Sequence, residues 1–125
     1  MSGVPVRVTT LVFDSHDAER LAAFWAGALG WDAQPPGVDG WVVVAPTDER
    51  SPFILLFMPV PEAKVVKNRV HIDVNPVGGD SERELERLLG LGARRVDVGQ
   101  AGEDWTVLAD PEGNEFCLLH RRLDA

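Results

Sequence analysis

The sequence predicts an α+β fold made of two copies of one βαβββ unit. The copies span about residues 6–58 and 69–120, within a single domain covering residues 1–125. Two observations predict the duplication: a strand pattern that occurs twice, and a Leu-Gly pair that ends each of two helical segments. The length of 125 residues suits one domain with one substantial core. The matching segments are Trp41–Pro46 with Trp105–Pro111, Phe53–Leu56 with Phe116–Leu119, and Leu29-Gly30 with Leu91-Gly92.

The first repeat opens with an apolar strand, Val6–Phe13. Ser15 or Asp17 then caps a helix, which carries one apolar stripe and ends at Gly30. Three strands follow the helix. The last two do not alternate between apolar and polar residues, so both of their faces are predicted to be covered. The stripe consists of Leu21, Phe24, Trp25, Ala28 and Leu29, and the strands are Trp31–Gln34, Trp41–Ala45 and Phe53–Met58.

The second repeat opens with the strand Arg69–Asn75, which alternates cleanly. A capping box, Ser81–Glu84, begins the second helix, and Gly90–Gly92 ends it. The turn Asp110–Gly113 has proline second and glycine fourth, the type I pattern. The helix stripe is Leu85, Leu88 and Leu89, and the later strands are Arg94–Val98, Trp105–Ala109 and Phe116–His120.

The two faces of the strand Arg69–Asn75 indicate where a binding site lies. Its apolar residues, Val70, Ile72 and Val74, are expected to meet the helices. His71 and Asp73 then point to the other side. The helices would thus cover the outer face of a curved, mostly antiparallel mixed sheet, whose inner face surrounds a pocket. Small-molecule sites are concave and largely apolar, with a few placed polar groups.

Composition excludes several classes of partner. The net charge of −8 and the absence of a basic run argue against nucleic acid. No apolar stretch is long enough to span a membrane, and the N-terminus lacks the layout of a signal peptide. The single cysteine cannot form an internal disulfide. These features predict a cytoplasmic protein with a small-molecule partner.

Five short motifs occur in a fixed order along the chain, and together they resemble the vicinal oxygen chelate superfamily. This superfamily includes the glyoxalase and bleomycin-resistance proteins. Within it the chain is most similar to the small bacterial glyoxalase-like domain group, through Lys67–His71 and Gly113–Cys117. The resemblance implies paired βαβββ units and a homodimer, but the fold hosts lyases, isomerases, dioxygenases and metal-free drug binders. The motifs are Asp17 with Phe24-Trp25, Leu29-Gly30-Trp31, Arg69–Asp73, Leu91-Gly92-Ala93 and Asp110–Phe116.

The resemblance also implies four metal-ligand positions, one on the first and one on the last strand of each repeat. His or Gln holds the first-strand positions and Glu the last-strand positions. Here the positions are Thr10, Ile54, His71 and Cys117, of which only His71 fits. Glu115 precedes the last position by two residues, roughly 7 Å along a strand. Because a stable centre needs three or four donors, no metal or other cofactor is expected.

His71 and Cys117 each have several interpretations. His71 can be interpreted as a metal ligand, a general base, a pocket residue that orients the ligand or pairs with Asp73 or Asn68, or a purely structural histidine. Cys117, predicted opposite His71, is interpreted as a small buried hydrophobe. The alternative, a nucleophile activated by the imidazole, lacks an orienting third group and an oxyanion hole.

Trp41 and Trp105 occupy equivalent places in the two repeats, where they either clamp a planar ligand or belong to the core. Ile54, Leu56 and Met58 share one strand face, which would favour an apolar ligand if it is the concave one. The predicted ligand-binding residues are Thr10, Trp41, Ile54, His71, Asp73, Trp105 and Cys117.

These observations favour a protein that binds a small, largely apolar organic molecule without a tightly bound metal. One alternative is a lyase, isomerase or dioxygenase that uses His71, with Glu115 or Cys117, to hold a divalent ion. Another is a non-catalytic structural or interaction domain. Whether the chain is an enzyme is left open by the sequence.

Overall fold

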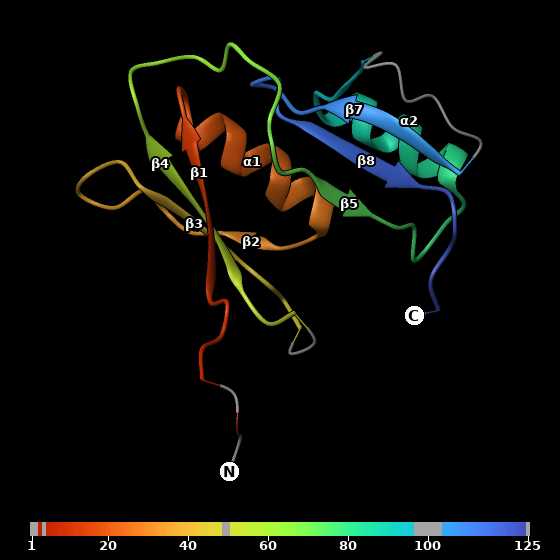
Figure 1. Cartoon of the computed structure of the whole chain (residues 1–125), viewed down its shortest axis with the longest axis horizontal. Helices are drawn as coiled ribbons and strands as arrows, with labels where there is room; N and C mark the ends of the chain where they lie inside the picture. The colour runs from red at the N-terminus through yellow and green to blue at the C-terminus, as the bar shows by residue number, and fades with distance from the viewer. Residues whose placement is uncertain (1–2, 4, 49–50, 97–103, 125) are drawn as a thin grey trace. The chain divides into compact units, whose positions relative to one another are not determined.

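The computed structural model describes residues 3, 5–48, 51–96 and 104–124. The chain separates into two compact units, Met1–Glu62 and Ala63–Ala125, each of which contains one βαβββ repeat (Figure 1). Each repeat forms its own four-stranded mixed sheet with one helix. The predicted α+β class and the internal duplication are therefore confirmed. Across the described residues, neither helix has the length and apolar character needed to cross a membrane.

The first unit is a sheet of strand order β1-β4-β3-β2 packed on α1. β1 and β4 pair in parallel, and the other two pairs are antiparallel. β1 is thus an edge strand, and its neighbour is the last strand of its own repeat. The elements are β1 (Thr10–Ser15), α1 (Ala18–Leu29), β2 (Asp32–Ala33), β3 (Val42–Ala45) and β4 (Ile54–Pro59).

An aromatic cluster joins α1 to one face of this sheet. The ring of Phe13 on β1 lies 5.8 Å from that of Trp25 and 5.0 Å from that of Phe57. Trp25 and Phe57 are fully buried, as the helical stripe predicts for Trp25. Asp17 is the N-cap and accepts a hydrogen bond from the backbone N–H of Arg20. The predicted helix is confirmed, with Asp17 rather than Ser15 as its cap.

Two details of the first repeat differ from prediction. β1 begins at Thr10, and Val6 and Val8 before it are 81% and 67% exposed. The prediction from the apolar run therefore placed the start of this strand too early in the sequence. β1 starts where its pairing with β4 starts, and hydrophobicity alone does not determine that point. β3 and β4 also alternate in burial, although both of their faces are apolar. The face toward α1 is fully buried and the opposite face of these strands is partly buried, so the predicted covering of both faces is complete on one side only.

The second unit repeats this topology, with strand order β5-β8-β7-β6. β5 and β8 are parallel, and the other pairs are antiparallel. Figure 1 shows α2 running along one face of the β7–β8 pair, and α2 contacts β8. The elements are β5 (Ile72–Val74), α2 (Ser81–Leu91), β6 (Arg94–Arg95), β7 (Trp105–Ala109) and β8 (Glu115–Leu119).

The second repeat departs from prediction mainly at the ends of its elements. Asp80, not Ser81, is the N-cap of α2, since its carboxylate accepts from the backbone N–H of Arg83. β5 has only three residues, and Val70, expected against the helices, is 75% exposed. Leu88 is the fully buried leucine of the predicted α2 stripe. The predicted strand Arg94–Val98 ends at Arg95, and its last two residues lie outside the described part.

The strand registers correct one part of the predicted repeat alignment. Trp105 pairs with Leu119 and Ala109 with Glu115. On the β3–β4 ladder Val44 pairs with Leu55, so one residue further along Ala45 is level with Ile54. If Trp41 is matched with Trp105, these registers match Ile54 with Glu115 and not with Cys117. The sequence match of Phe53–Leu56 with Phe116–Leu119 is displaced by two residues from this correspondence.

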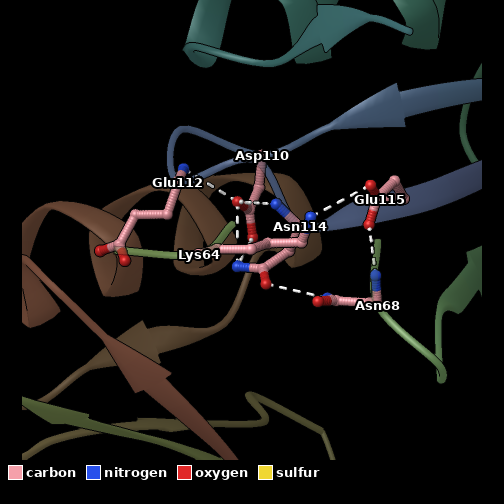
Figure 2. A network of polar contacts seen from close by, with 6 residues as sticks. All are labelled: Lys64, Asn68, Asp110, Glu112, Asn114 and Glu115. Carbon is pink, nitrogen blue, oxygen red and sulfur yellow. Dashed lines mark hydrogen bonds and ion pairs between the residues drawn. The ribbon is translucent and has the colours of Figure 1, made fainter. Parts of the chain in front are cut away.

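A buried carboxylate organises the turn between β7 and β8 (Figure 2). Asp110 is fully buried, and its Oδ1 accepts from the backbone N–H groups of Glu112 and Asn114 at 2.9 and 3.0 Å. The side-chain amide of Asn114 donates to both Asp110 oxygens. The N–H of Gly113 closes the turn on the Asp110 carbonyl, and the φ of 88° at Gly113 suits glycine. The predicted turn is thus held by its own aspartate.

The same network extends to the segment that leads into β5. Asn68 donates from its side chain to the Asn114 oxygen at 2.9 Å and from its backbone to Glu115 at 3.0 Å. Lys64 forms an ion pair of 3.1 Å with the other Glu115 oxygen. Burial raises the pKa of Glu115, but the backbone hydrogen bonds and Lys64 outweigh it and hold the pKa below its ordinary value of 4.5.

Replacing Asp110 with alanine is expected to lower the free energy of unfolding by about 2–4 kcal/mol, because buried N–H groups lose their acceptor. Urea denaturation measures the change. Asp124→Ala, which removes an exposed carboxylate near the C-terminus, should stay within about 0.5 kcal/mol of the unmutated chain. Equal effects of the two substitutions would show that the Asp110 network does not stabilise the turn.

Glu115→Gln should destabilise the chain by about 1–2 kcal/mol at pH 7. Since the folded-state pKa of Glu115 is lowered, its contribution is complete above the unfolded-state pKa and is lost as the pH falls through the folded-state value. Urea unfolding from pH 7 downward should therefore show the two proteins converging below the ordinary value of 4.5. A difference that is unchanged at pH 3, or that matches the effect of the exposed Glu86→Gln control, would contradict this role.

Candidate functional site

Three side chains of the types that bind metal ions, His71, Asp73 and Cys117, lie close together at the β5 edge of the second sheet. Asp73 pairs directly with Cys117 on β8. His71 lies two residues before Asp73 and therefore points to the same face. Its Nδ1 is 3.0 Å from Asp73 Oδ1. One donor atom from each of the three residues lies within 4.8 Å of the others.

The site combines exposed and buried groups. The side chains of His71 and Asp73 are 44% and 45% exposed, whereas Cys117 is 7% exposed. Burial raises the pKa of the Cys117 thiol, and the charge and hydrogen bond of Asp73 raise it further, against a smaller opposing effect of Lys67. The resting site therefore holds a neutral thiol at its base and a histidine–aspartate pair at its rim.

The structure confirms part of the predicted arrangement around His71. The expected pairing with Asp73 is present. Asn68, the other proposed partner, is instead bound to Asn114 and Glu115. Cys117 lies opposite Asp73 in the register rather than opposite His71. Sequence reasoning missed this pairing because nothing local in either strand sets the parallel register.

Glu115 does not belong to the cluster of His71, Asp73 and Cys117. Both of its oxygens are already bound, one by Lys64 and one by the backbone of Asn68. A cation at Glu115 would have to displace an ammonium group that is itself only 18% exposed. Glu115 thus holds the segment of Lys64 and Asn68 in place, and these contacts argue against its predicted alternative role as a metal ligand.

The four positions implied for a shared metal do not provide a full donor set. Thr10 and Ile54 are direct partners in the β1–β4 register, so the first repeat does bring its two positions together. Ile54, however, has no donor atom, and a threonine hydroxyl is a weak ligand. The residues present do not fit a metal held by both repeats.

The face of the first sheet that points away from α1 is apolar and only partly buried. Alternation along β3 and β4 places the partly buried residues opposite the fully buried ones. Val12 and Trp41 on this side are 48% and 41% exposed. Trp105 is half-buried at the start of β7, on the sheet face that carries Cys117. The residues of this face, called the open face below, are Val12, Trp41, Val43, Ile54, Leu56 and Met58.

Several solved structures share the fold of this chain. FosX, a fosfomycin resistance protein from Mesorhizobium loti, is 16% identical with a TM-score of 0.67, and the match covers 96% of this chain and 95% of the FosX chain. A glyoxalase-related enzyme from Fulvimarina pelagi is 17% identical with a TM-score of 0.66, and the match covers 92% of this chain and 88% of that enzyme. TnmS3, an antibiotic binding protein from Streptomyces sp. CB03234, is 19% identical with a TM-score of 0.56, and the match covers 95% of this chain and 98% of the TnmS3 chain. At these identities the likeness is one of fold.

No curated protein sequence is significantly similar to the chain. The family model described as "Glyoxalase-like domain" matches residues 10–119, which is nearly the whole chain. That match spans both repeats, from β1 to the end of β8. The chain therefore belongs to the glyoxalase-like domain family of the vicinal oxygen chelate superfamily.

Proposed function

We propose that the chain binds a small, largely apolar organic molecule and needs no tightly bound metal to do so. The observation that carries the proposal is the open face of the first sheet. Its aliphatic, methionine and tryptophan side chains are only partly buried, whereas the opposite face of β4 carries fully buried residues. Apolar surface left exposed in this way is typical of binding sites.

Trp41 is proposed to give the ligand a flat aromatic surface on this face. The predicted polar and aromatic contacts from residues of the second unit, namely His71, Asp73, Trp105 and Cys117, stay predictions. Two structural neighbours give this proposal indirect support. One is a fosfomycin resistance protein and another is an antibiotic binding protein. Because fold alone does not determine activity, these two neighbours indicate only which ligand classes to test first.

The main alternative is a metal-dependent lyase, isomerase or dioxygenase using His71. The donor set counts against it, since Thr10 and Ile54 cannot complete a metal centre shared by the repeats. The second alternative is an interaction domain whose open face meets another protein. The homodimer and the cytoplasmic location stay predictions.

Thermal-shift measurements with aromatic and aliphatic small molecules, including the antibiotic classes named for the structural neighbours, test the binding proposal. A true ligand at 100 times its Kd adds about 2.7 kcal/mol of stability, which corresponds to a rise in Tm of about 10 °C for a chain of this size. Tryptophan fluorescence should report the same Kd.

Matched substitutions locate the ligand. Leu56→Asn on the open face should weaken binding at least tenfold. Val38→Ala, which changes a fully exposed valine, should leave the Kd unchanged. If no compound raises the Tm, or if Leu56→Asn instead dissociates a dimer at constant ligand response, the interaction domain becomes the better account.

Alkylation of Cys117 distinguishes a structural thiol from a nucleophile. Because burial and Asp73 both raise its pKa, iodoacetamide at pH 8 with EDTA should modify the native chain at least tenfold more slowly than the urea-unfolded chain. Asp73→Asn lowers the thiol pKa and should speed the native reaction, whereas Asp124→Asn should not. A native rate equal to the unfolded rate would support the catalytic alternative.

A further inference from the structure

We propose that His71, Asp73 and Cys117 bind a thiophilic divalent cation, Zn²⁺ in the first place, at a site that lies entirely within the second repeat. The proposal is independent of the organic ligand described above. It rests on side chains whose positions are fixed by one strand pair, β5 and β8. It also differs from a metal shared by both repeats, since Asp73 takes part and the first repeat contributes nothing.

The geometry provides three donors on one side of the sheet. Donor atoms of His71, Asp73 and Cys117 already lie within 4.8 Å of one another, so small side-chain rotations would bring them around one ion. The contact between His71 Nδ1 and Asp73 Oδ1 holds two of the ligands side by side. Each of these groups keeps a second donor atom, Nε2 and Oδ2, so the pairing does not exhaust their capacity.

The donor types determine which cation is favoured. One imidazole nitrogen, one carboxylate oxygen and one thiolate form a mixed set that suits Zn²⁺, whereas Mg²⁺ and Ca²⁺ prefer oxygen ligands alone. Cys117 would bind as the thiolate, with its proton released to solvent when the ion enters. The chain's net charge of −8 adds a general attraction for cations.

The exposure of the ligands indicates an exchangeable ion. Three protein donors leave a fourth tetrahedral position open to water. His71 and Asp73 are nearly half exposed, so the ion would enter from solvent with the buried sulfur at the base of the site. A site of this form binds less tightly than a closed four-ligand structural site. The chain purified in EDTA would accordingly be folded, because neither its sheets nor its turn network needs the ion.

Cobalt spectroscopy tests the proposal directly. The EDTA-treated chain, transferred to chelator-free buffer with a phosphine reductant, is titrated with CoCl₂. Saturation should produce tetrahedral ligand-field bands and a thiolate-to-cobalt charge-transfer band. Equimolar ZnCl₂ should remove both, because Zn²⁺ binds such donors more tightly than Co²⁺. A large excess of MgCl₂ should leave the spectrum unchanged.

Single substitutions assign the donors. Cys117→Ser should abolish the charge-transfer band, while His71→Ala and Asp73→Ala should each weaken Co²⁺ binding at least tenfold. His16→Ala, which changes an exposed histidine in the first unit, serves as the matched control, and circular dichroism verifies folding of each variant.

The spectrum of the unmutated chain decides the question even if a variant fails to fold. Absence of the charge-transfer band at saturating Co²⁺ would overturn the proposal. So would a band that survives Cys117→Ser, or His71→Ala and Asp73→Ala variants that titrate like the unmutated chain. Organic-ligand binding measured in EDTA is unaffected by any of these outcomes, so the two proposals fail separately.

Discussion

The parallel pairing of the first and last strands of each repeat determines which side chains can act together. In the second repeat it sets Asp73 beside Cys117 and, through the two-residue alternation of β5, adds His71 to the same face. In the first repeat the same pairing sets Thr10 beside Ile54. One topological constraint thus produces a cluster of ligand side chains in one repeat and an apolar surface in the other, because only the residue types differ.

The polar network around Asp110 compensates for the shortness of β5. A three-residue strand at a sheet edge has few ladder hydrogen bonds to hold it. Lys64 and Asn68 add side-chain and backbone contacts to Glu115 and Asn114, close to where β8 begins. The segment before His71 is therefore fastened to the same turn that starts β8. The sequence suggested Glu115 as an alternative metal ligand, but its oxygens bind Lys64 and Asn68, and it is not part of the cluster of His71, Asp73 and Cys117.

The fold was predictable from the sequence because duplication, helix stripes and turn chemistry are local signals. Asp17 as a cap and Trp105–Ala109 as a strand were both correct. The registers were not predictable. The matches of Trp41 with Trp105 and of Phe53 with Phe116 both relied on residue type, and the hydrogen-bonded registers show that they disagree by two residues. The same limit applies to the candidate site. The sequence identified His71 and Cys117 and predicted that Asp73 pairs with His71, but it did not predict that Asp73 also lies beside the Cys117 thiol.

Divergence of the two repeats has a chemical consequence. A metal centre shared by two halves fails as soon as one half loses its donors, as Thr10 and Ile54 illustrate. A centre within one half can survive that loss if a nearby residue on the same strand replaces the missing donor, and Asp73 lies where such a residue is needed. The first repeat is then free to present apolar side chains.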